Sequence, residues 1–413
     1  MKAILIVGDG LADRPIPELK NKTPLEMARK PSLNKIAEIG ICGIMDPIAP
    51  GIPPGSDTAT LALLGYDPRE VYSGRGALEA LGSGVDVLPQ DVVFRCNFAT
   101  VDENLNVVDR RAGRIETSDS SKLAQAFKKI VIEDHRDVQI TFKNTVQHRA
   151  ILRLRGPKLS RRVSDSDPQK TATQILTVNP CDDTPEAKKT ADIVNKFTRY
   201  SLEILKSHTV NAQRVKEGLL PANAILCRGA GKLPVVTPIS LRYGIRAAAV
   251  SVMPLIRGVC KAAGCDLLDV KGATGTYDTD AIAKAKTTVK ALKTHDFVFL
   301  HVKATDVASH DGKAEQKIRM IEKIDGMAGY ILKKVGLDET FIAVTADHTT
   351  SLVTREHEGD PVPVAITGPG IRTDDVKEFD ERNCAKGGLG RIRGKDLMPI
   401  IINLMGKAKK FGA

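Results

Sequence analysis

Residues 296–348 decide the fold class, and they read DFVFLHVKATDVASHDGKAEQKIRMIEKIDGMAGYILKKVGLDETFIAVTADH. Two short apolar runs, residues 296–302 and 340–345, flank a segment of helical length at residues 313–335. Short apolar runs without polar alternation are typical of strands that are buried on both faces of a parallel sheet. The segment therefore predicts a strand–helix–strand unit with parallel strands.

The first 40 residues continue this pattern. Residues 2–7 predict another buried strand, and residues 25–39 predict a helix with Gly40 as its C-cap. Strand-like runs alternate with helix-length segments at both ends of the chain, and no internal repeat is visible. We therefore expect an α/β fold whose core is a largely parallel sheet flanked by helices.

The middle of the chain has a different pattern, with shorter alternating strands at residues 92–101, 138–142 and 150–154 and a long amphipathic helix near residues 184–207. We interpret residues 76–230 as an inserted α+β domain. The core then consists of residues 1–75 and 231–413. Glycine-rich stretches at 73–76 and 228–231 are candidate hinges, although paired glycines also occur in simple turns.

The composition narrows the class of protein. The chain has 413 residues with 42% hydrophobic and 27% charged residues, which is typical of an ordinary globular protein. Its longest apolar stretches, residues 247–256 and 397–405, are shorter than a membrane span requires, so we expect no membrane association. The N-terminus lacks a signal-like cleavage region, and the seven cysteines include no CxxC pair. We expect a cytoplasmic protein; the sequence leaves its oligomeric state open.

The net charge indicates an anionic ligand. Lys+Arg minus Asp+Glu is 61 − 50 = +11, which predicts attraction for anions. Aromatic residues are only 4% and tryptophan is absent, so the basic residues are not interleaved with stacking rings. This argues against nucleic acid as the partner and favours a small phosphorylated substrate.

An aspartate follows each of three predicted core strands: Asp9, Asp306 and Asp347. In a parallel sheet these three positions lie at the carboxyl edge, where ligands of α/β folds bind. An aspartate after a strand is usually only a turn former or a helix N-cap. Histidines near these aspartates favour a shared site, because three of the eight histidines, His310, His348 and His357, lie within ten residues of them.

The spacing of these residues suggests metal binding. Asp306 and His310 are four residues apart, so on a helix both side chains can reach one ion. Asp347 and His348 are adjacent, and they can share an ion only where the backbone turns sharply. Three aspartates and three histidines suit a binuclear centre of Mn²⁺, Zn²⁺ or a similar ion better than an all-oxygen Mg²⁺ site. The alternative is a scatter of turn residues and satisfied histidines.

Ser56 lies in the loop PPGSDTA, residues 53–59, just before a predicted helix at residues 57–64. A serine at this position is ordinarily an N-cap. The same position also places its hydroxyl beside the positive end of the helix, where a phosphoryl group can be held. The sequence therefore leaves two roles open for Ser56, a structural cap or a nucleophile.

Taken together, the motifs resemble those of the alkaline phosphatase superfamily and, within it, the archaeal type of 2,3-bisphosphoglycerate-independent phosphoglycerate mutase. The similarity runs over nearly the whole chain and includes RCNFAT (95–100), DRRAGRI (109–115), SDSDP (164–168) and GATG (272–275). Thr60, Val307 and Ser309 differ from the residues usual in the family, and none of them is an expected metal ligand. The resemblance implies an alkaline-phosphatase-like core with an inserted substrate-binding domain.

The resemblance also implies the site residues. Asp306, His310 and His357 would bind one divalent ion, and Asp9, Ser56, Asp347 and His348 would bind the other; Mn²⁺ is the first choice, with Mg²⁺, Co²⁺ or Zn²⁺ as alternatives. Ser56 would take the phosphoryl group of 3-phosphoglycerate and return it to the other hydroxyl of glycerate, giving 2-phosphoglycerate with no added 2,3-bisphosphoglycerate. Lys303 would stabilise charge on the transferring phosphoryl oxygens.

Glycerate has to stay bound between the two transfers, and the inserted domain and its hinges contain residues that suit its carboxylate. Arginine pairs with carboxylates and phosphates through two parallel hydrogen bonds, although a single arginine is more often a surface cation. The candidates are Arg75, Arg110, Arg111, Arg114, His148, Arg149, Arg214 and Arg228, and the run 109–114 with Arg75 is favoured.

Two other functions remain as alternatives. A phosphatase or phosphotransferase of the same superfamily would use the same metal ligands on another small phosphate ester. A basic nucleic-acid-binding protein with a degenerate site would explain the charge, but the complete set of seven candidate ligands argues against it.

Overall fold

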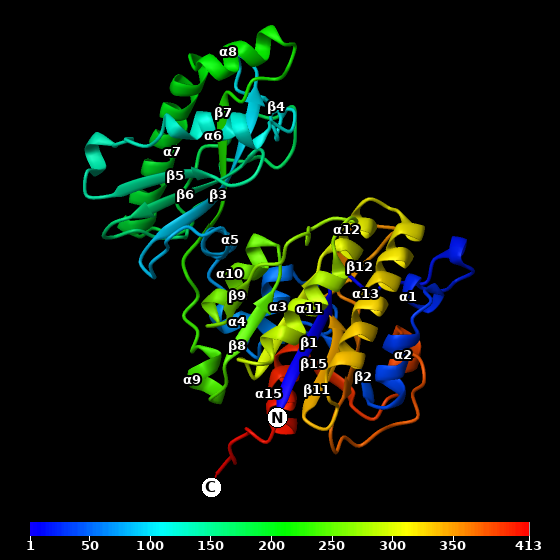
Figure 1. Ribbon diagram of the computed structural model, residues 1–413. Coiled ribbons are helices and arrows are strands. Elements are labelled where there is room, and N and C mark those ends of the chain that lie inside the picture. The colour runs from blue at the N-terminus through cyan, green and yellow to red at the C-terminus, as the bar shows by residue number, and fades with distance from the viewer. Residues whose placement is uncertain (413) are drawn as a thin grey trace. The chain divides into compact units, whose positions relative to one another are not determined.

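The computed structural model describes residues 1–412 (Figure 1). The chain packs as two units: unit 1 contains Met1–Tyr72 and the chain from Val236 onward, and unit 2 contains Ser73–Val235. Each bound of unit 2 thus lies within five residues of the corresponding bound of the insertion that we expected at 76–230. Among the described residues, no helix has both the length and the apolarity needed to cross a bilayer.

Unit 1 is built on an eight-stranded sheet in the order β15-β2-β14-β11-β1-β10-β8-β9. Its central strand β1 (Lys2–Gly8) is parallel to β10 on one side and to β11 on the other, and only β14 is antiparallel to its neighbours. The strands β1, β10 and β11 are fully or almost fully buried along their length. The largely parallel α/β sheet predicted from the sequence is therefore confirmed. The other strands are β2 (Ile41–Asp46), β8 (Ala247–Val250), β9 (Asp266–Leu268), β10 (Phe297–Val302), β11 (Thr340–Ala346), β14 (Val362–Thr367) and β15 (Gly390–Arg393).

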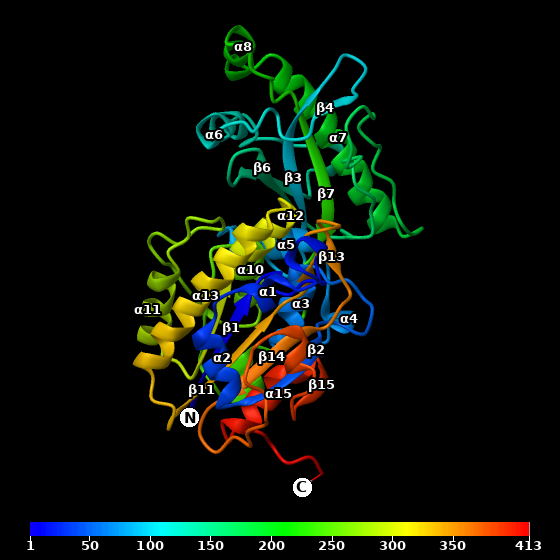
Figure 2. The same ribbon diagram turned by 90° about the vertical axis from the view of Figure 1, so that its right-hand side faces the viewer.

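Helices cover both faces of this sheet, as Figure 2 shows. Helix α13 (Ala314–Lys334) packs with α11 (Ala281–Ala291) and α2 (Pro31–Glu38) on one face. Helix α3 (Ser56–Leu63) packs with two further helices on the other. The remaining elements of unit 1 are α1 (Pro24–Met27), α4 (Pro68–Val71), α9 (Ile239–Tyr243), α10 (Pro254–Ala262), α12 (Ala304–His310), α14 (Glu381–Cys384), α15 (Gly394–Leu404) and the short pair β12 (Thr349–Thr350) and β13 (His357–Glu358).

The single helix predicted over residues 25–39 is wrong, because the chain forms two helices there. Helix α1 ends at Met27, Ala28 is extended, and α2 begins at Pro31. The proline has no amide hydrogen and disfavours a helical residue before it, so it starts a helix rather than continuing one. The C-cap of α2 is Ile39, one residue before the predicted Gly40.

Unit 2 is an antiparallel five-stranded sheet with its own apolar core. Strand β3 (Val92–Val101) pairs with β4, β6 and β7, and β5 pairs with β6. Helix α7 (Pro185–Lys206), capped by Thr184, matches the predicted helix at 184–207, and its Phe197 packs against Phe127 and Phe142. The other elements are α5 (Arg75–Gly82), β4 (Val107–Asp109), α6 (Thr117–Gln125), β5 (Gln139–Asn144), β6 (Arg149–Arg155), α8 (Thr209–Lys216) and β7 (Ala224–Gly231).

Candidate active site

Three aspartates meet at the carboxyl edge of the unit 1 sheet. Asp9 directly follows β1, and Asp347 directly follows the neighbouring strand β11. Asp306 lies in the first turn of α12, which begins two residues after β10, the neighbour of β1 on its other side. All three side chains are buried. The register of the parallel strands therefore brings Asp9 together with two carboxylates that lie about 300 residues further along the chain.

Three histidines present the same ring atom to these carboxylates. His310 Nδ1 is 2.6 Å from the carbonyl oxygen of Arg355, and His357 Nδ1 is 2.8 Å from that of Pro54. A carbonyl oxygen only accepts, so each Nδ1 carries the proton and each Nε2 keeps its lone pair. Nε2 of each ring lies 3.4 Å from Asp306 Oδ1. Backbone acceptors thus fix the tautomer that a metal ligand requires.

His348 is held in the same way by a side chain. Its Nδ1 is 2.9 Å from Thr350 Oγ1, and this hydroxyl is 2.8 Å from Asp306 Oδ1. Because the carboxylate takes the hydroxyl proton, Thr350 accepts from Nδ1 and leaves His348 Nε2 free. Thr350 therefore links two of the candidate metal ligands.

Two groups of side chains could each hold a metal ion. The ligand atoms of Asp306, His348 and His357 lie within 4.8 Å of one another, and so do those of Asp9, Asp347 and His348. His348 belongs to both groups, whereas the sequence resemblance assigned it to one. Asp347 and His348 converge, with Oδ2 and Nε2 3.4 Å apart, because the chain bends directly after β11.

The charges at this edge are unbalanced. Lys303 Nζ lies 3.0 Å from Asp9 Oδ1 and 2.5 Å from Asp306 Oδ2, so one ammonium pairs with two of the three buried carboxylates. Burial is the largest single influence on Asp9 and opposes its ionisation, but the charge of Lys303 together with contacts from His301 and His348 holds the pKa of that carboxyl well below its usual value. Burial and then the negative charge of Asp9 raise the pKa of Asp347.

The unbalanced carboxylates fit divalent cations. Asp347 Oδ2 is buried and has no hydrogen-bond partner among residues 1–412. Buried carboxylate oxygens are normally paired or bound to a metal. Carboxylate oxygens combined with histidine nitrogens suit Mn²⁺, Co²⁺ or Zn²⁺.

Ser56 is the first residue of α3, and Gly55 occupies the N-cap position. The serine hydroxyl makes no capping bond; instead, its Oγ lies 3.2 Å from His348 Nε2. The structure therefore excludes the cap and places the hydroxyl beside a residue that both candidate metal groups share.

Sequence reasoning missed His301, a fully buried residue of β10. Its Nε2 is 3.0 Å from Asp9 Oδ2, without the alignment of a hydrogen bond. A histidine inside an apolar strand gives no signal of its own, since core histidines are common. Thr350 was missed too, because a threonine after Asp347-His348-Thr349 is unremarkable until its contacts are known.

A separate cavity of about 270 Å³ lies in unit 2 and is lined mainly by arginines. Six of the eight predicted substrate-binding residues line this cavity, and three further lining residues were not predicted. The lining consists of the predicted Arg110, Arg111, Arg114, His148, Arg149 and Arg228, together with Arg95, Asn97 and Gln147. Burial lowers the pKa of His148 to about 4, so its imidazole is neutral at pH 7.

The arginines in this cavity fall into two sets. Arg95 is 3.2 Å from Glu79, and Arg110 donates two hydrogen bonds to the buried Asp167. Arg228 Nε is 3.7 Å from the same Asp167. The remaining lining arginines, Arg111, Arg114 and Arg149, form no ion pair within the described chain. They provide the unbalanced positive charge of the cavity.

Two predicted substrate residues lie elsewhere. Arg214 is buried, and its guanidinium donates to the carbonyl oxygens of Ala112 and Leu220, which is a structural role within unit 2. Arg75 is the exposed first residue of α5 and lies 3.8 Å from Glu79. Neither lines the cavity.

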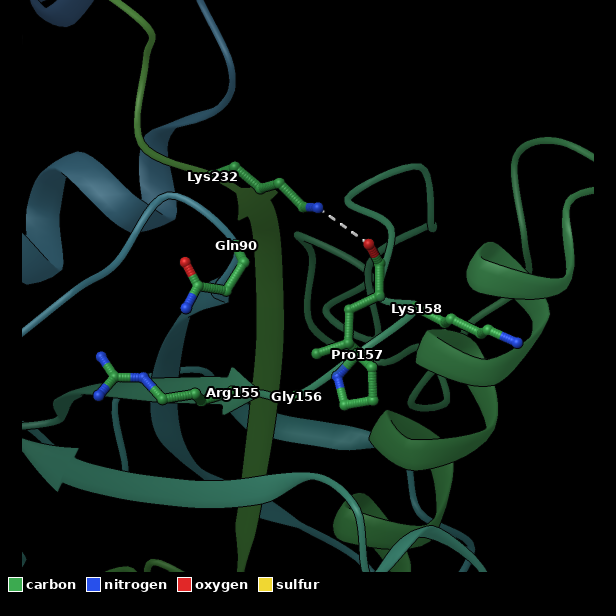
Figure 3. Close-up of a pocket in the computed structure, with 7 residues that line it drawn as sticks. Gln90, Arg155, Gly156, Pro157, Lys158 and Lys232 are labelled. Carbon is green, nitrogen blue, oxygen red and sulfur yellow. Dashed lines mark hydrogen bonds between the residues drawn. The ribbon is translucent and has the colours of Figure 1, made fainter.

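A second basic cavity of unit 2, shown in Figure 3, offers less free charge. Lys232 Nζ donates to the carbonyl oxygen of Leu159 at 2.9 Å, as the dashed line shows. Arg155 is paired with Asp86 and Asp91. Two of its three lining cations, Lys232 and Arg155, are therefore already bonded, and Lys158 is the third.

The fold and the two sites define a class: an α/β protein with a carboxylate–histidine centre suited to two divalent ions and a separate cavity for an anion. Comparison with known proteins narrows the class. The family model of the 2,3-bisphosphoglycerate-independent phosphoglycerate mutase matches residues 37–211. The chain belongs to this family, because full-length relatives with this name are about half identical to it.

Two of these relatives match the chain along its whole length. The protein of Methanosphaera stadtmanae is 50% identical over 415 residues and that of Methanothermobacter thermautotrophicus 46% over 414, each with complete coverage of both chains. A solved Pyrococcus horikoshii protein matches with a TM-score of 0.88 and 42% identity, over 100% of this chain and 99% of that one. The cofactor-independent phosphoglycerate mutase of Thermoplasma acidophilum matches with a TM-score of 0.73 and 38% identity, over 98% and 100%.

Proposed function

We propose that this protein interconverts 3-phosphoglycerate and 2-phosphoglycerate without 2,3-bisphosphoglycerate. The family assignment supports the reaction, since the full-length relatives carry this activity in their names. The observation that carries the mechanism is the position of Ser56, whose hydroxyl makes no helix cap and lies 3.2 Å from His348 Nε2 in the carboxylate–histidine centre.

Ser56 is the nucleophile in this proposal. Its hydroxyl gives up its proton as Oγ attacks the phosphorus of 3-phosphoglycerate, the bond from phosphorus to the 3-oxygen breaks, and a proton passes to that oxygen to give the free 3-hydroxyl of glycerate. The 2-hydroxyl of the bound glycerate then attacks the phosphoserine, gives up its proton, and releases Ser56. The N-terminus of α3, where Ser56 lies, favours the negative charge of the phosphoryl group.

Asp306, His310 and His357 would hold one divalent ion, and Asp9, Ser56 and Asp347 the other, with His348 in reach of both. The ions supply positive charge that lowers the pKa of the Ser56 hydroxyl and stabilises the transferring phosphoryl group. Lys303, already between Asp9 and Asp306, adds a third cation at the same edge.

The arginine-lined cavity of unit 2 would hold the glycerate carboxylate. Arg111, Arg114 and Arg149 are the lining arginines without an acidic partner among residues 1–412, so their hydrogen-bond donors remain available to a ligand. Arg95, Arg110 and Arg228 contribute charge while bonded to Glu79 and Asp167. A cavity that keeps glycerate bound between the two transfers favours isomerisation over hydrolysis.

The test is an assay of the purified protein with Mn²⁺ and 3-phosphoglycerate and no bisphosphate, followed by phosphorus NMR. We expect 2-phosphoglycerate to appear without inorganic phosphate. A strict requirement for added 2,3-bisphosphoglycerate would overturn the proposal. Release of phosphate faster than isomerisation would instead identify a phosphatase.

A further inference from the structure

Lys317 is a fully buried lysine on α13, and it is not among the site residues predicted from the sequence. Its Nζ lies 3.0 Å from the carbonyl oxygen of Ala12, 2.8 Å from Asp13 Oδ2 and 2.9 Å from the carbonyl oxygen of Thr350. An ammonium has three hydrogens, so all of its donors are used. A buried ammonium is costly unless each of its hydrogens has an acceptor, and here each has one.

The acceptors of Lys317 belong to the two loops that carry three of the seven candidate metal ligands, Asp9, Asp347 and His348. Ala12 and Asp13 lie on the loop after β1 that begins with Asp9, and the chain around Thr350 follows Asp347 and His348. Lys317 therefore ties together two segments that are more than 330 positions apart. The loops also contact each other directly, since the backbone amide of Thr350 donates to the carbonyl oxygen of Ala12 at 3.2 Å, and Lys317 adds a restraint from α13 to this contact.

Thr350 passes this restraint on to the ligands. Its carbonyl oxygen accepts from Lys317, while its hydroxyl donates to Asp306 and accepts from His348. Asp306 belongs to one candidate metal group, and His348 belongs to both. A shift of Thr350 would displace ligand atoms in both groups.

The contribution of Lys317 is geometric rather than electrostatic. Asp13, also buried, neutralises the ammonium at 2.8 Å and accepts from the backbone amide of Leu352. A neutral pair adds little net field at the metal site. Removing the lysine alone would leave a buried, uncompensated carboxylate, so a test has to remove both charges.

We propose that Lys317, paired with Asp13, is a positioning residue that holds the two ligand-bearing loops in register for metal binding. This inference rests on the proposed metal-dependent function. It predicts that loss of Lys317 weakens both metal sites together, even where the protein stays folded.

The test compares the full-length wild type with Lys317→Met and with the charge-neutral pair Lys317→Met/Asp13→Asn. Each protein is stripped with a chelator, checked for native circular dichroism, and titrated with Mn²⁺ alone by calorimetry. We expect two ions per wild-type chain. In the double variant, we expect at least a tenfold loss of Mn²⁺ affinity at both sites.

Asp325→Asn is the matched control, because Asp325 is a buried polar residue of the same helix whose carboxylate is hydrogen-bonded to α2. Its Oδ1 accepts from the backbone amides of Ser32 and Leu33. We expect this variant to melt at a lower temperature and to bind Mn²⁺ as tightly as the wild type.

The outcomes separate the inference from the function on which it rests. A folded double variant with wild-type Mn²⁺ affinity would overturn the role of Lys317 and leave the metal site intact. Unfolding of both Lys317 variants, with Asp325→Asn folded, would show a merely structural lysine. A wild type that binds no Mn²⁺ would overturn the metal-dependent function itself.

Discussion

Ser56 shows how one side chain separates a structural role from a chemical one. Gly55 is the N-cap of α3, and the first backbone amides of the helix gain nothing from the serine hydroxyl. The hydroxyl instead points to His348, at the edge of the sheet where the carboxylates meet. A buried hydroxyl beside a metal-type centre is placed for reaction rather than for helix stability.

The Ser56→Ala variant should therefore be folded and inactive. We expect a loss of about 1 kcal/mol in the free energy of unfolding, from one hydrogen bond, and a fall in isomerisation rate of at least about a thousandfold. Urea unfolding and the NMR assay measure the two effects. Wild type trapped with substrate should show phosphoserine at position 56 by mass spectrometry. Near-normal turnover by the alanine variant would refute the covalent mechanism.

Arg149 tests the glycerate cavity at the same scale. It lines the cavity, has no acidic partner among the described residues, and its buried Nε makes no hydrogen bond. Losing a charge-assisted hydrogen bond removes about 1.5–3 kcal/mol of binding, so Arg149→Met should raise KM about 10- to 100-fold and change kcat less.

The control for this prediction is Arg162→Met. Arg162 is an exposed arginine of the same unit that pairs with Asp182 outside the cavity, and its loss should leave KM unchanged. Equal KM values for Arg149→Met and Arg162→Met would show that Arg149 does not bind the substrate.

At the scale of elements, short helices near the site depend on buried polar contacts. The first residue of α14, Glu381, accepts from the backbone amide of Asp13 and from the hydroxyl of Thr23. It therefore joins α14 to the loop after β1 and to the start of α1. Burial raises the pKa of its carboxyl from 4.5 to about 7.

This shift predicts a pH dependence of stability. The folded protein binds the Glu381 proton more tightly than the unfolded chain, so the contribution is complete below about pH 4.5 and is lost as the pH rises through 7. A change of pKa from 4.5 to about 7 corresponds to about 3 kcal/mol, and because solvent still reaches part of the Glu381 side chain we expect a smaller loss, about 2 kcal/mol. Glu381→Gln should remove it.

Urea unfolding of both proteins between pH 5 and 8 measures this effect. Subtracting the free energy of unfolding of Glu381→Gln from that of the wild type at each pH cancels the contributions of all other titrating groups. We expect this difference to change steadily between pH 5 and 8. Parallel curves for wild type and Glu381→Gln would show that Glu381 has an ordinary pKa.

At the scale of the whole molecule, the insertion has the features of an independent domain. Its ends lie side by side, because the backbone amide of Lys232 donates to the carbonyl oxygen of Ser73 at 3.0 Å. Unit 2 also has its own apolar core around Phe94, Phe98, Phe127 and Phe197. These are the properties expected of a segment that folds alone.

Residues 73–235, expressed alone, should therefore unfold in one cooperative step. The isolated unit contains the whole arginine-lined cavity, so it should bind 3-phosphoglycerate weakly in the presence of a chelator and catalyse no isomerisation. Calorimetric titration measures the binding, and the same unit carrying Arg149→Met is the control. An isolated unit without cooperative unfolding would show that its core depends on unit 1.

The sequence by itself determined the fold class and the kinds of side chain at the site. Burial of β1, β10 and β11 on both faces is visible as uninterrupted apolar runs, and an aspartate after a parallel strand has one possible edge to occupy. These features are local, so the periodicity and the spacing of residues encode them.

Only the tertiary structure decided which side chains meet. It placed His348 in reach of both candidate metal groups, joined Thr350 to Asp306, buried Arg214 away from the arginine-lined cavity, and set Lys317 between two ligand loops. The contact of Asp9 with Lys303 joins residues 294 positions apart. Such pairings depend on strand register and helix packing, which no local pattern of residues encodes.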